Sequence, residues 1–224
     1  MPDVYDESNR GNWKALADRC LDAPAFHRNH GAITNVLLRL LGDRTGNVIE
    51  IGSGTGQHVI TFAAALPHLI WWPSDPAPSH RASINAWRAR RGLMNVRRPI
   101  DLDAAASDWK LGEIERPPSQ EIDAILVINV LHITPWPVSL GLMQGAARYL
   151  KSDGMLIVYG PFAQGGVHVA PSNAAFDTHL RKQNDGWGVR DSADLNAAAT
   201  TNGLKLAEML DMPANNTTLV FERG

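Results

Sequence analysis

Continuous apolar stretches alternate along the chain with segments whose apolar residues recur at helical spacing. The stretches are rich in β-branched residues, which is typical of strands buried on both faces of a parallel sheet. They span residues 48–51, 69–72, 122–128 and 155–159. The segments of helical spacing span residues 59–66, 79–91 and 138–150. This alternation predicts an α/β fold in which each helix leads the chain back to a further parallel strand.

Three further strands complete the predicted sheet. Residues 95–100 suggest a strand between the second and fourth, and residues 204–211 and 217–223 predict two final strands joined by residues 212–216. Because parallel neighbours need a crossover of a dozen or more residues, so short a link predicts antiparallel pairing. We therefore expect a doubly wound, mostly parallel seven-stranded sheet with helices on both faces and an antiparallel C-terminal hairpin.

Composition narrows the class of protein. A chain of 224 residues with 44% hydrophobic content favours one domain, 1–224, with residues 1–45 as an N-terminal helical cover and residues 163–191 as a substrate-side insertion. The net charge of −2 gives no basic face for nucleic acid. Cys20 stands alone, so no disulfide and no metal set are expected. No signal peptide is evident and no apolar run reaches the ~20 residues of a membrane span, which predicts a cytoplasmic protein.

The first predicted strand contains Glu50 and ends in three alternate glycines, Gly52, Gly54 and Gly56. Glycines allow a tight turn and let a ligand approach the backbone closely. This spacing differs from the pattern that wraps a dinucleotide pyrophosphate. A carboxylate beside the turn repels a diphosphate, but it accepts hydrogen bonds from an ammonium or hydroxyl group. The motif therefore suits S-adenosylmethionine better than NAD.

Polar side chains also follow the next predicted strands. Asp75 ends the second strand, where a carboxylate can bind both ribose hydroxyls, and Asp101 and Asp103 follow the third, where either can accept from the adenine amine. Asn129 and His132 follow the fourth. Because ligands of doubly wound sheets bind beyond the carboxyl ends of the strands, we expect these groups to line one cleft.

Together these residues resemble the class I, Rossmann-like S-adenosylmethionine-dependent methyltransferases. More specific strings resemble the uncharacterised family that includes methyltransferase-like protein 26. These strings begin at Arg28, Ile51, Trp72, Asn129, Tyr159, Ala170, Trp187 and Met212. The resemblance implies that the three glycines pack under the methionine part of the cofactor, that Asp75 binds ribose, that Asp103 lies near adenine and that Asn129 lies near the methionine end. The candidate cofactor contacts are Arg28, Asn29, Glu50, Gly52, Ser53, Gly54, Gly56, Asp75, Asp101, Leu102, Asp103, Asn129, Val130 and His132.

Two residues are candidates for catalysis. His132 is either a general base or a cofactor contact, and Tyr159 either positions the acceptor or packs the loop after its strand. The string from Asn129 to His132 is not the Asn-Pro-Pro-aromatic string of exocyclic-amine methyltransferases, so methylation of bases or glutamine is less favoured. Arg28 either closes over the methionine carboxylate or caps the N-terminus of a helix.

The acceptor pocket is expected around the segment that follows the fifth strand. Asn173, Asp177 and Arg181 are spaced four apart and share one helical face, which is either substrate-facing or solvated. The candidate substrate contacts are Trp136, Phe162, His168, Asn173, Asp177, Arg181 and Trp187. The predicted function is transfer of a methyl group from S-adenosylmethionine to an O, N or S nucleophile of a small molecule. The alternatives are a non-catalytic S-adenosylmethionine-binding protein and a nicotinamide-dependent oxidoreductase.

Overall fold

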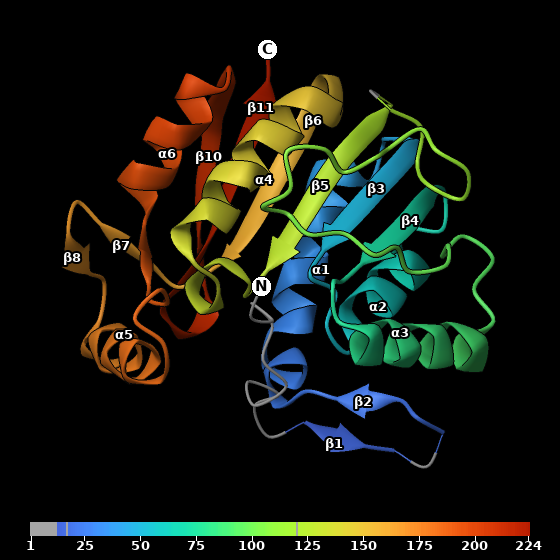
Figure 1. Ribbon diagram of the computed structural model, residues 1–224, viewed down its shortest axis with the longest axis horizontal. Helices are drawn as coiled ribbons and strands as arrows, with labels where there is room; N and C mark the ends of the chain where they lie inside the picture. Colours follow the sequence, from blue (N-terminus) through green and yellow to red (C-terminus); the bar gives the residue numbers. More distant parts are fainter. Residues whose placement is uncertain (1–12, 17, 120) are drawn as a thin grey trace. The chain divides into compact units, whose positions relative to one another are not determined.

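The computed structural model describes residues 13–16, 18–119 and 121–224. Within this range the chain divides into two compact units. Unit 1 contains the described residues up to Leu102 together with Lys110–Asp123, and unit 2 contains Asp103–Trp109 and Ala124–Gly224. Figure 1 labels most of the helices and strands of both units. Among the described residues, no helix is long and apolar enough to cross a membrane.

Unit 1 is built on two parallel strands with three helices. Its elements are β1 (Lys14–Ala15), β2 (Leu21–Asp22), α1 (Pro24–Leu41), β3 (Gly46–Ile51), α2 (Gln57–Ala65), β4 (Leu69–Ser74) and α3 (Pro78–Arg91). Strand β3 pairs with β4 in parallel, from Gly46 opposite Leu69 to Ile51 opposite Ser74. Helix α2 contacts β4 and also packs against α1 and α3. The expected strand–glycine turn–helix order therefore holds here.

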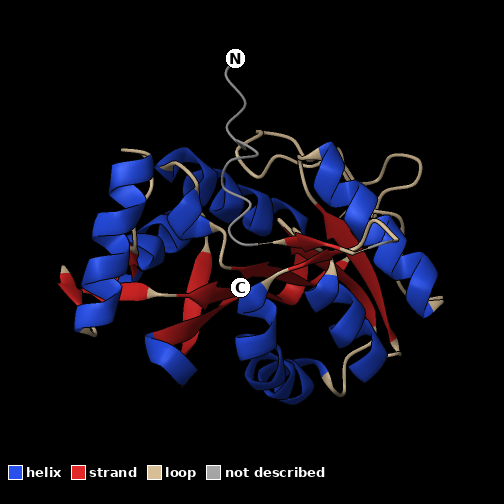
Figure 2. Ribbon diagram, turned by 90° about the horizontal axis from the view of Figure 1, so that it is seen from below, coloured by secondary structure: helices blue, strands red, loops and turns tan. Residues whose placement is uncertain are grey.

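Unit 2 is dominated by antiparallel pairing. Its elements are β5 (Ile122–Ile128, which begins in unit 1), η2 (Leu131–Ile133), α4 (Trp136–Tyr149), β6 (Leu150–Gly160), β7 (Phe162–Gln164), β8 (Val167–His168), α5 (Pro171–Gln183), β9 (Arg190–Asp191), α6 (Ser192–Thr201), β10 (Leu204–Met212), η3 (Pro213–Asn215) and β11 (Asn216–Arg223). Strand β11 lies antiparallel to both β6 and β10. Helix α4 contacts β6 and α6 contacts β10, so helices lie beside strands in this unit (Figure 2). Strands β7, β8 and β9 form a separate small sheet.

The strands pair in the order β3-β4 in unit 1 and β10-β11-β6-β5 in unit 2. The described residues thus supply six such strands, so the expected number of seven was wrong. Residues 95–100 form only two isolated parallel bridges to β4, Trp71 with Val96 and Ser74 with Ile100. Pro99 carries no N–H and cannot donate to a ladder between those two bridges. The stretch therefore follows β4 without becoming a strand, and the fold is a mixed α/β fold.

Gly56 shows how tightly α2 packs. It caps α2 in the left-handed conformation with φ of 87°, and a Cβ placed on it would lie 2.9 Å from the Ile84 Cα of α3. Gly92 has the same handedness with φ of 62°, but a Cβ there meets open space. The two glycines form a matched pair, because both have left-handed backbone but only Gly56 is crowded.

We predict that Gly56→Ala lowers the free energy of unfolding by about 2–4 kcal/mol, since left-handed strain and overpacking add. Gly92→Ala carries only the left-handed strain and should lose about 1 kcal/mol. Urea denaturation of the two variants measures both values. Equal losses would show that contact with Ile84 contributes nothing.

Candidate functional site

The glycine turn after β3 is held to the end of β4 by hydrogen bonds that its backbone N–H groups donate. All three glycines have positive φ, at 66° for Gly52, 53° for Gly54 and 87° for Gly56. The Ser53 N–H donates to the Ser74 carbonyl at 2.8 Å, and the Gly54 N–H donates to Asp75 Oδ2 at 3.0 Å. Gly56 packs on α3, so its lack of a side chain serves helix packing. Gly54 does not pack on α3, because a Cβ placed on it would instead meet the Trp13 indole at 3.1 Å.

Asp75 is buried and already bonded by the chain on both carboxylate oxygens. Besides the bond from Gly54, its Oδ1 accepts from the Ala77 N–H at 2.9 Å and from His80 Nδ1 at 3.0 Å. A carboxylate has about four acceptor positions, so these three bonds fix its orientation and leave capacity for a ligand hydroxyl. The structure thus places the predicted ribose-binding carboxylate directly at the glycine turn.

Glu50 has a buried carboxyl oxygen that makes no hydrogen bond within the described part of the chain. This oxygen is Oε2, and the residue is 2% exposed. Burial raises the pKa of Glu50 to about 8; the negative charge of Asp75 adds to this, and a hydrogen bond with Ser53 opposes it. Leaving a buried polar atom without a partner costs about 1–3 kcal/mol. A ligand with an ammonium or hydroxyl group would supply that partner.

The predicted contacts on α1 have different surroundings. Asn29 is buried, and its Oδ1 accepts from His58 Nε2 of α2 at 2.8 Å. Burial lowers the pKa of His58 to about 3, so this imidazole is neutral and ties the two helices together. Arg28 is exposed on α1. Because α1 begins at Pro24 after Ala23, the interpretation of Arg28 as a helix cap was wrong.

Asp101 and Asp103, the two candidates for the contact with adenine, have different surroundings. Asp101 forms an ion pair with Arg81 at 3.3 Å, and Arg81 in turn donates to the Asp75 carbonyl at 2.8 Å. Asp103 accepts from the Ala105 N–H at 2.9 Å in a local turn and belongs to unit 2. Leu102, between them, is buried. Within unit 1, Asp101 is therefore the acid tied to the end of β4.

A second group of side chains converges in unit 2, around Gly160 at the end of β6. A Cβ on Gly160 would lie 3.6 Å from His132 Nδ1, 3.8 Å from Phe162 Cζ and 3.9 Å from Asn129 Oδ1. Asn129 turns the chain with φ of 57°, and its N–H donates to the Tyr159 carbonyl at 2.9 Å. We call Asn129, His132, Gly160, Phe162 and Phe176 the Gly160 cluster.

Phe176 of α5 completes the Gly160 cluster, because its ring meets His132 edge-on with centroids 5.3 Å apart. His132 is 7% exposed, and burial, helped by the charge of Arg190, lowers its pKa to about 4. The imidazole is therefore neutral near pH 7 and has a lone pair for a proton. Tyr159 and Val130 beside it are both buried.

Arg190 fixes the backbone around His132. Its guanidinium donates to the carbonyls of Leu131, Thr134 and Gly186, and the His132 carbonyl accepts from the Gly188 N–H at 2.9 Å. All these acceptors are backbone groups, so Arg190 serves to hold the segment after β5. Burial lowers the pKa of Arg190, and the positive charge of Arg181 adds to this effect.

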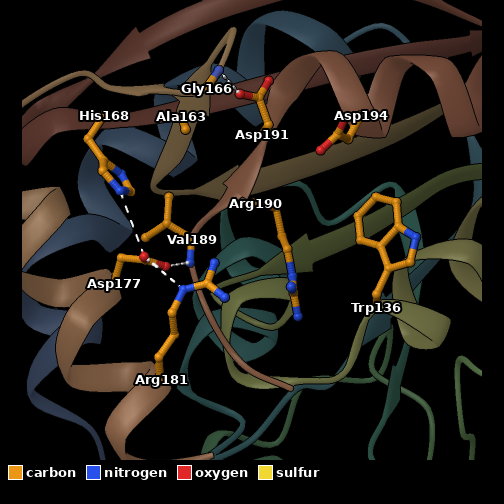
Figure 3. A pocket seen from close by; sticks show the side chains of 10 residues that line it. All are labelled: Trp136, Ala163, Gly166, His168, Asp177, Arg181, Val189, Arg190, Asp191 and Asp194. Atoms are coloured by element: carbon orange, nitrogen blue, oxygen red, sulfur yellow. Dashed lines mark hydrogen bonds and ion pairs between the residues drawn. The ribbon is translucent and has the colours of Figure 1, made fainter. Parts of the chain in front are cut away.

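A cavity of about 460 Å³ lies beside this segment (Figure 3). Four predicted substrate residues line it, namely Trp136, His168, Asp177 and Arg181. Asp177 accepts from Arg181 Nε at 2.9 Å and from the Val189 N–H at 2.7 Å, and His168 lies 3.8 Å away. The charges of Asp177 and Arg181 therefore compensate each other. The bond from the Val189 N–H to Asp177 holds α5 against the backbone that leads into β9.

The remaining predicted substrate residues lie elsewhere. Phe162 belongs to the Gly160 cluster, and the Asn173 side chain donates to the Asn215 carbonyl at 2.9 Å. Trp187 is buried. Asn173 and Asp177 share one helical face, but Asn173 contacts the β10–β11 link whereas Asp177 lines the cavity. Among the described residues, no group of three or more acidic, His or Cys side chains could hold a metal ion.

Sequence reasoning missed His80 and Phe176, and it placed Arg190 in the string that begins at Trp187 without its role at His132. His80 follows Asp75 by five residues, which is a usable signal at the start of a helix. Phe176 is an apolar residue within a polar stripe, which is also a signal, and the structure leaves it 37% exposed. Nothing local marks the role of Arg190, because it depends on contacts with distant backbone.

The fold is similar to solved methyltransferase structures. A putative O-methyltransferase from Nostoc punctiforme matches with a TM-score of 0.73 and 16% identity over 89% of this chain and 58% of that one. An O-methyltransferase family protein from Burkholderia thailandensis matches with 0.69 and 15% over 87% and 59%. CalO1, a methyltransferase in calicheamicin biosynthesis in its SAH-bound form, matches with 0.65 and 19% over 87% and 54%. At these identities the likeness shows the fold, and the chain spans a little over half the length of these proteins.

A sequence-family model gives the relationship directly. The model, described as a protein of unknown function (DUF938), matches residues 21–223 and so covers nearly the whole chain of 224 residues. The resemblance to the family that includes methyltransferase-like protein 26 stays a prediction. By the extent of the match, the chain belongs to the DUF938 family of proteins of unknown function.

Proposed function

We propose that this protein transfers a methyl group from S-adenosylmethionine to a small-molecule acceptor. The observation that carries the proposal is the buried Glu50 oxygen without a partner beside a glycine turn that Asp75 closes. An amino-acid ammonium and a ribose diol match these two acids, whereas a pyrophosphate would meet two acidic side chains at the same turn. The structural similarity to methyltransferases supports the same cofactor.

The residues of unit 1 fit the adenosyl cofactor. Glu50 and the backbone of Gly52 and Gly54 would receive its methionine part, Asp75 its ribose, and Asp101 its adenine amine. Ser53, Leu102, Arg28 and Asn29, and in unit 2 Asp103, Asn129 and Val130, stay proposed contacts from the sequence. When bound, S-adenosylmethionine supplies an electrophilic methyl group on a sulfonium.

The Gly160 cluster is the proposed acceptor site. Phe162 and Phe176 offer aromatic surface to an apolar acceptor, and the neutral His132 accepts the proton that an acceptor hydroxyl loses. Tyr159, buried next to this cluster, is the second proposed catalytic residue. A small hydroxylated aromatic acceptor fits this combination best.

The proposal also keeps the sequence-based domain organisation. In this proposal residues 1–224 form one methyltransferase domain and residues 163–191 are a substrate-side insertion. Residues 1–45 are the proposed N-terminal cover, although its described part contains strands β1 and β2 besides helix α1 and so is not wholly helical. Trp136, His168, Asp177, Arg181, Asn173 and Trp187 stay in the proposal as residues that shape this wall. The mutual pairing of Asp177 and Arg181 assigns them to its stability more than to acceptor charge.

A direct test uses the full chain with S-adenosylmethionine and metabolite extracts, and mass spectrometry for S-adenosylhomocysteine. We expect extract-dependent formation of S-adenosylhomocysteine together with a product that is one methyl group heavier. Oxidation of NADH by the same extracts without that product would favour the oxidoreductase alternative instead. Binding of S-adenosylmethionine with no turnover on any extract would favour the non-catalytic alternative.

We predict that Asp75→Ala weakens S-adenosylhomocysteine binding by about 1.5–3 kcal/mol, because the carboxylate accepts charge-assisted hydrogen bonds from ribose. Isothermal calorimetry measures the affinity, and thermal unfolding checks that the glycine turn has not collapsed. Asp75→Asn, which keeps one acceptor oxygen, should recover part of the loss. An unchanged affinity in a folded Asp75→Ala protein removes this residue from the site.

We also predict that His132→Ala lowers turnover by about 10²–10⁴-fold while S-adenosylhomocysteine affinity stays within about twofold. Because the pKa of His132 is lowered to about 4, the wild-type rate should be flat near neutral pH and fall only as the pH drops through about 4. Initial rates between pH 4 and 8 measure this profile.

Tyr159→Phe is the variant to compare with His132→Ala. It removes only a hydroxyl, and it should lower turnover without changing the affinity for the cofactor. Normal turnover in both variants would place the acceptor elsewhere. Loss of cofactor binding in His132→Ala would instead assign this residue to the cofactor.

A further inference from the structure

Trp13 lies directly on the glycine turn of unit 1. A Cβ placed on Gly54 would be 3.1 Å from the Trp13 Cη2 atom, so the indole touches this glycine where a side chain would otherwise stand. The indole also packs on His80 with ring centroids 4.9 Å apart and planes tilted by 52°. His80 is the residue that bonds Asp75 Oδ1. One aromatic side chain therefore contacts Gly54 directly and also contacts the imidazole that bonds Asp75.

Within the described part of the chain, β1 has fewer contacts than its partner strand. Strand β1 pairs with β2 at Lys14 and Ala15, which are both exposed, and the Leu16 N–H continues the pairing by donating to the Cys20 carbonyl at 2.8 Å. On β2, the Leu21 N–H donates to Ser83 Oγ at 2.8 Å and the Leu21 carbonyl accepts from Trp87 Nε1 at 2.9 Å. We therefore expect β1 to move more easily than β2, which is bonded to α3.

Gln57 links β2 to the glycine turn itself. Its Nε2 donates to Asp22 Oδ1 at 2.6 Å, and its Oε1 accepts from the Ala23 N–H at 2.8 Å. Gln57 is the first residue of α2, immediately after Gly56. These hydrogen bonds fix the base of the β1–β2 hairpin to the residue that follows the glycine turn. They therefore help to place Trp13 beside Gly54.

We propose that Trp13 is the cover of the cofactor site, an aromatic side chain that lifts from Gly54 to admit an S-adenosyl compound and then closes over it against His80. This inference rests on the proposed function. If a ligand contacts Gly54 and Asp75, the Trp13 indole would form the outer wall of its binding site. An aromatic face there excludes water and packs on the ligand, which slows its release.

Calorimetry and stopped-flow kinetics with S-adenosylhomocysteine test the cover in the full chain. Trp13→Ala should weaken binding at least fivefold, mainly through faster dissociation, and Trp13→Phe should restore most of the affinity. Trp87→Phe, which frees the Leu21 carbonyl but leaves Trp13 in place, should give a smaller change of the same sign. Unchanged or tighter binding in Trp13→Ala overturns the proposal.

Trp72→Phe is the matched control. The Trp72 indole donates to Asn47 Oδ1 on β3 at 2.9 Å, and no described contact joins it to the turn. This variant should bind S-adenosylhomocysteine as the wild type does. An equal loss in Trp72→Phe and Trp13→Phe would mean that any indole replacement weakens the protein, which contradicts a specific cover.

A second readout separates failure of the cover from failure of the proposed function. In the ¹⁵N-labelled protein, the indole N–H resonance of Trp13 is assigned by its absence in Trp13→Phe. We expect S-adenosylhomocysteine to shift this resonance. If the compound binds but the resonance stays in place, the cover is wrong and the proposed cofactor stands. If the compound does not bind the wild-type protein at all, the proposed function fails and the cover fails with it.

Discussion

The hydrogen bond from the Gly54 N–H to Asp75 Oδ2 is the constraint on which the candidate cofactor site depends. It joins the turn after β3 to the end of β4, two points that lie 21 residues apart in the chain. Because Ala77 and His80 hold the other carboxylate oxygen, the acid cannot rotate away without breaking several bonds. The glycine turn keeps its shape through this acid, and the same acid remains available to a ligand.

Burial decides the charge state of the groups that matter. Glu50 has its pKa raised to about 8, whereas His58 and His132 have theirs lowered to about 3 and 4. In each case the first cause is removal of the charged form from water. Near neutral pH the two imidazoles are neutral and Glu50 is mostly protonated. A cationic ammonium near Glu50 would favour its ionised form, so that cofactor binding and proton release are linked at this residue.

The sequence predicted those features that depend on local patterns. The apolar strand, the glycine spacing and the acid after the second strand identify the turn, since each follows from residues close together in the chain. The expected third strand was wrong because the apolar pattern did not take account of Pro99, which cannot join a ladder. The extra small sheet of β7, β8 and β9 was not predicted, since strands of two or three residues carry no periodicity.

Features that depend on distant contacts were beyond the sequence. Arg190 holds the backbone around His132 by donating to the carbonyls of Thr134 and Leu131, which lie 56 and 59 residues away in the chain. A pattern of side chains cannot predict bonds to backbone carbonyls so far away. Gly160 stands in the string that begins at Tyr159, but that string does not show that Asn129 and His132, from the segment after β5, lie beside it. The most direct measurement of the central claim is calorimetric titration of the full chain with S-adenosylhomocysteine and, separately, with NADH. The account predicts saturable binding of S-adenosylhomocysteine at one site and no heat of binding with NADH, and the reverse pattern would contradict it.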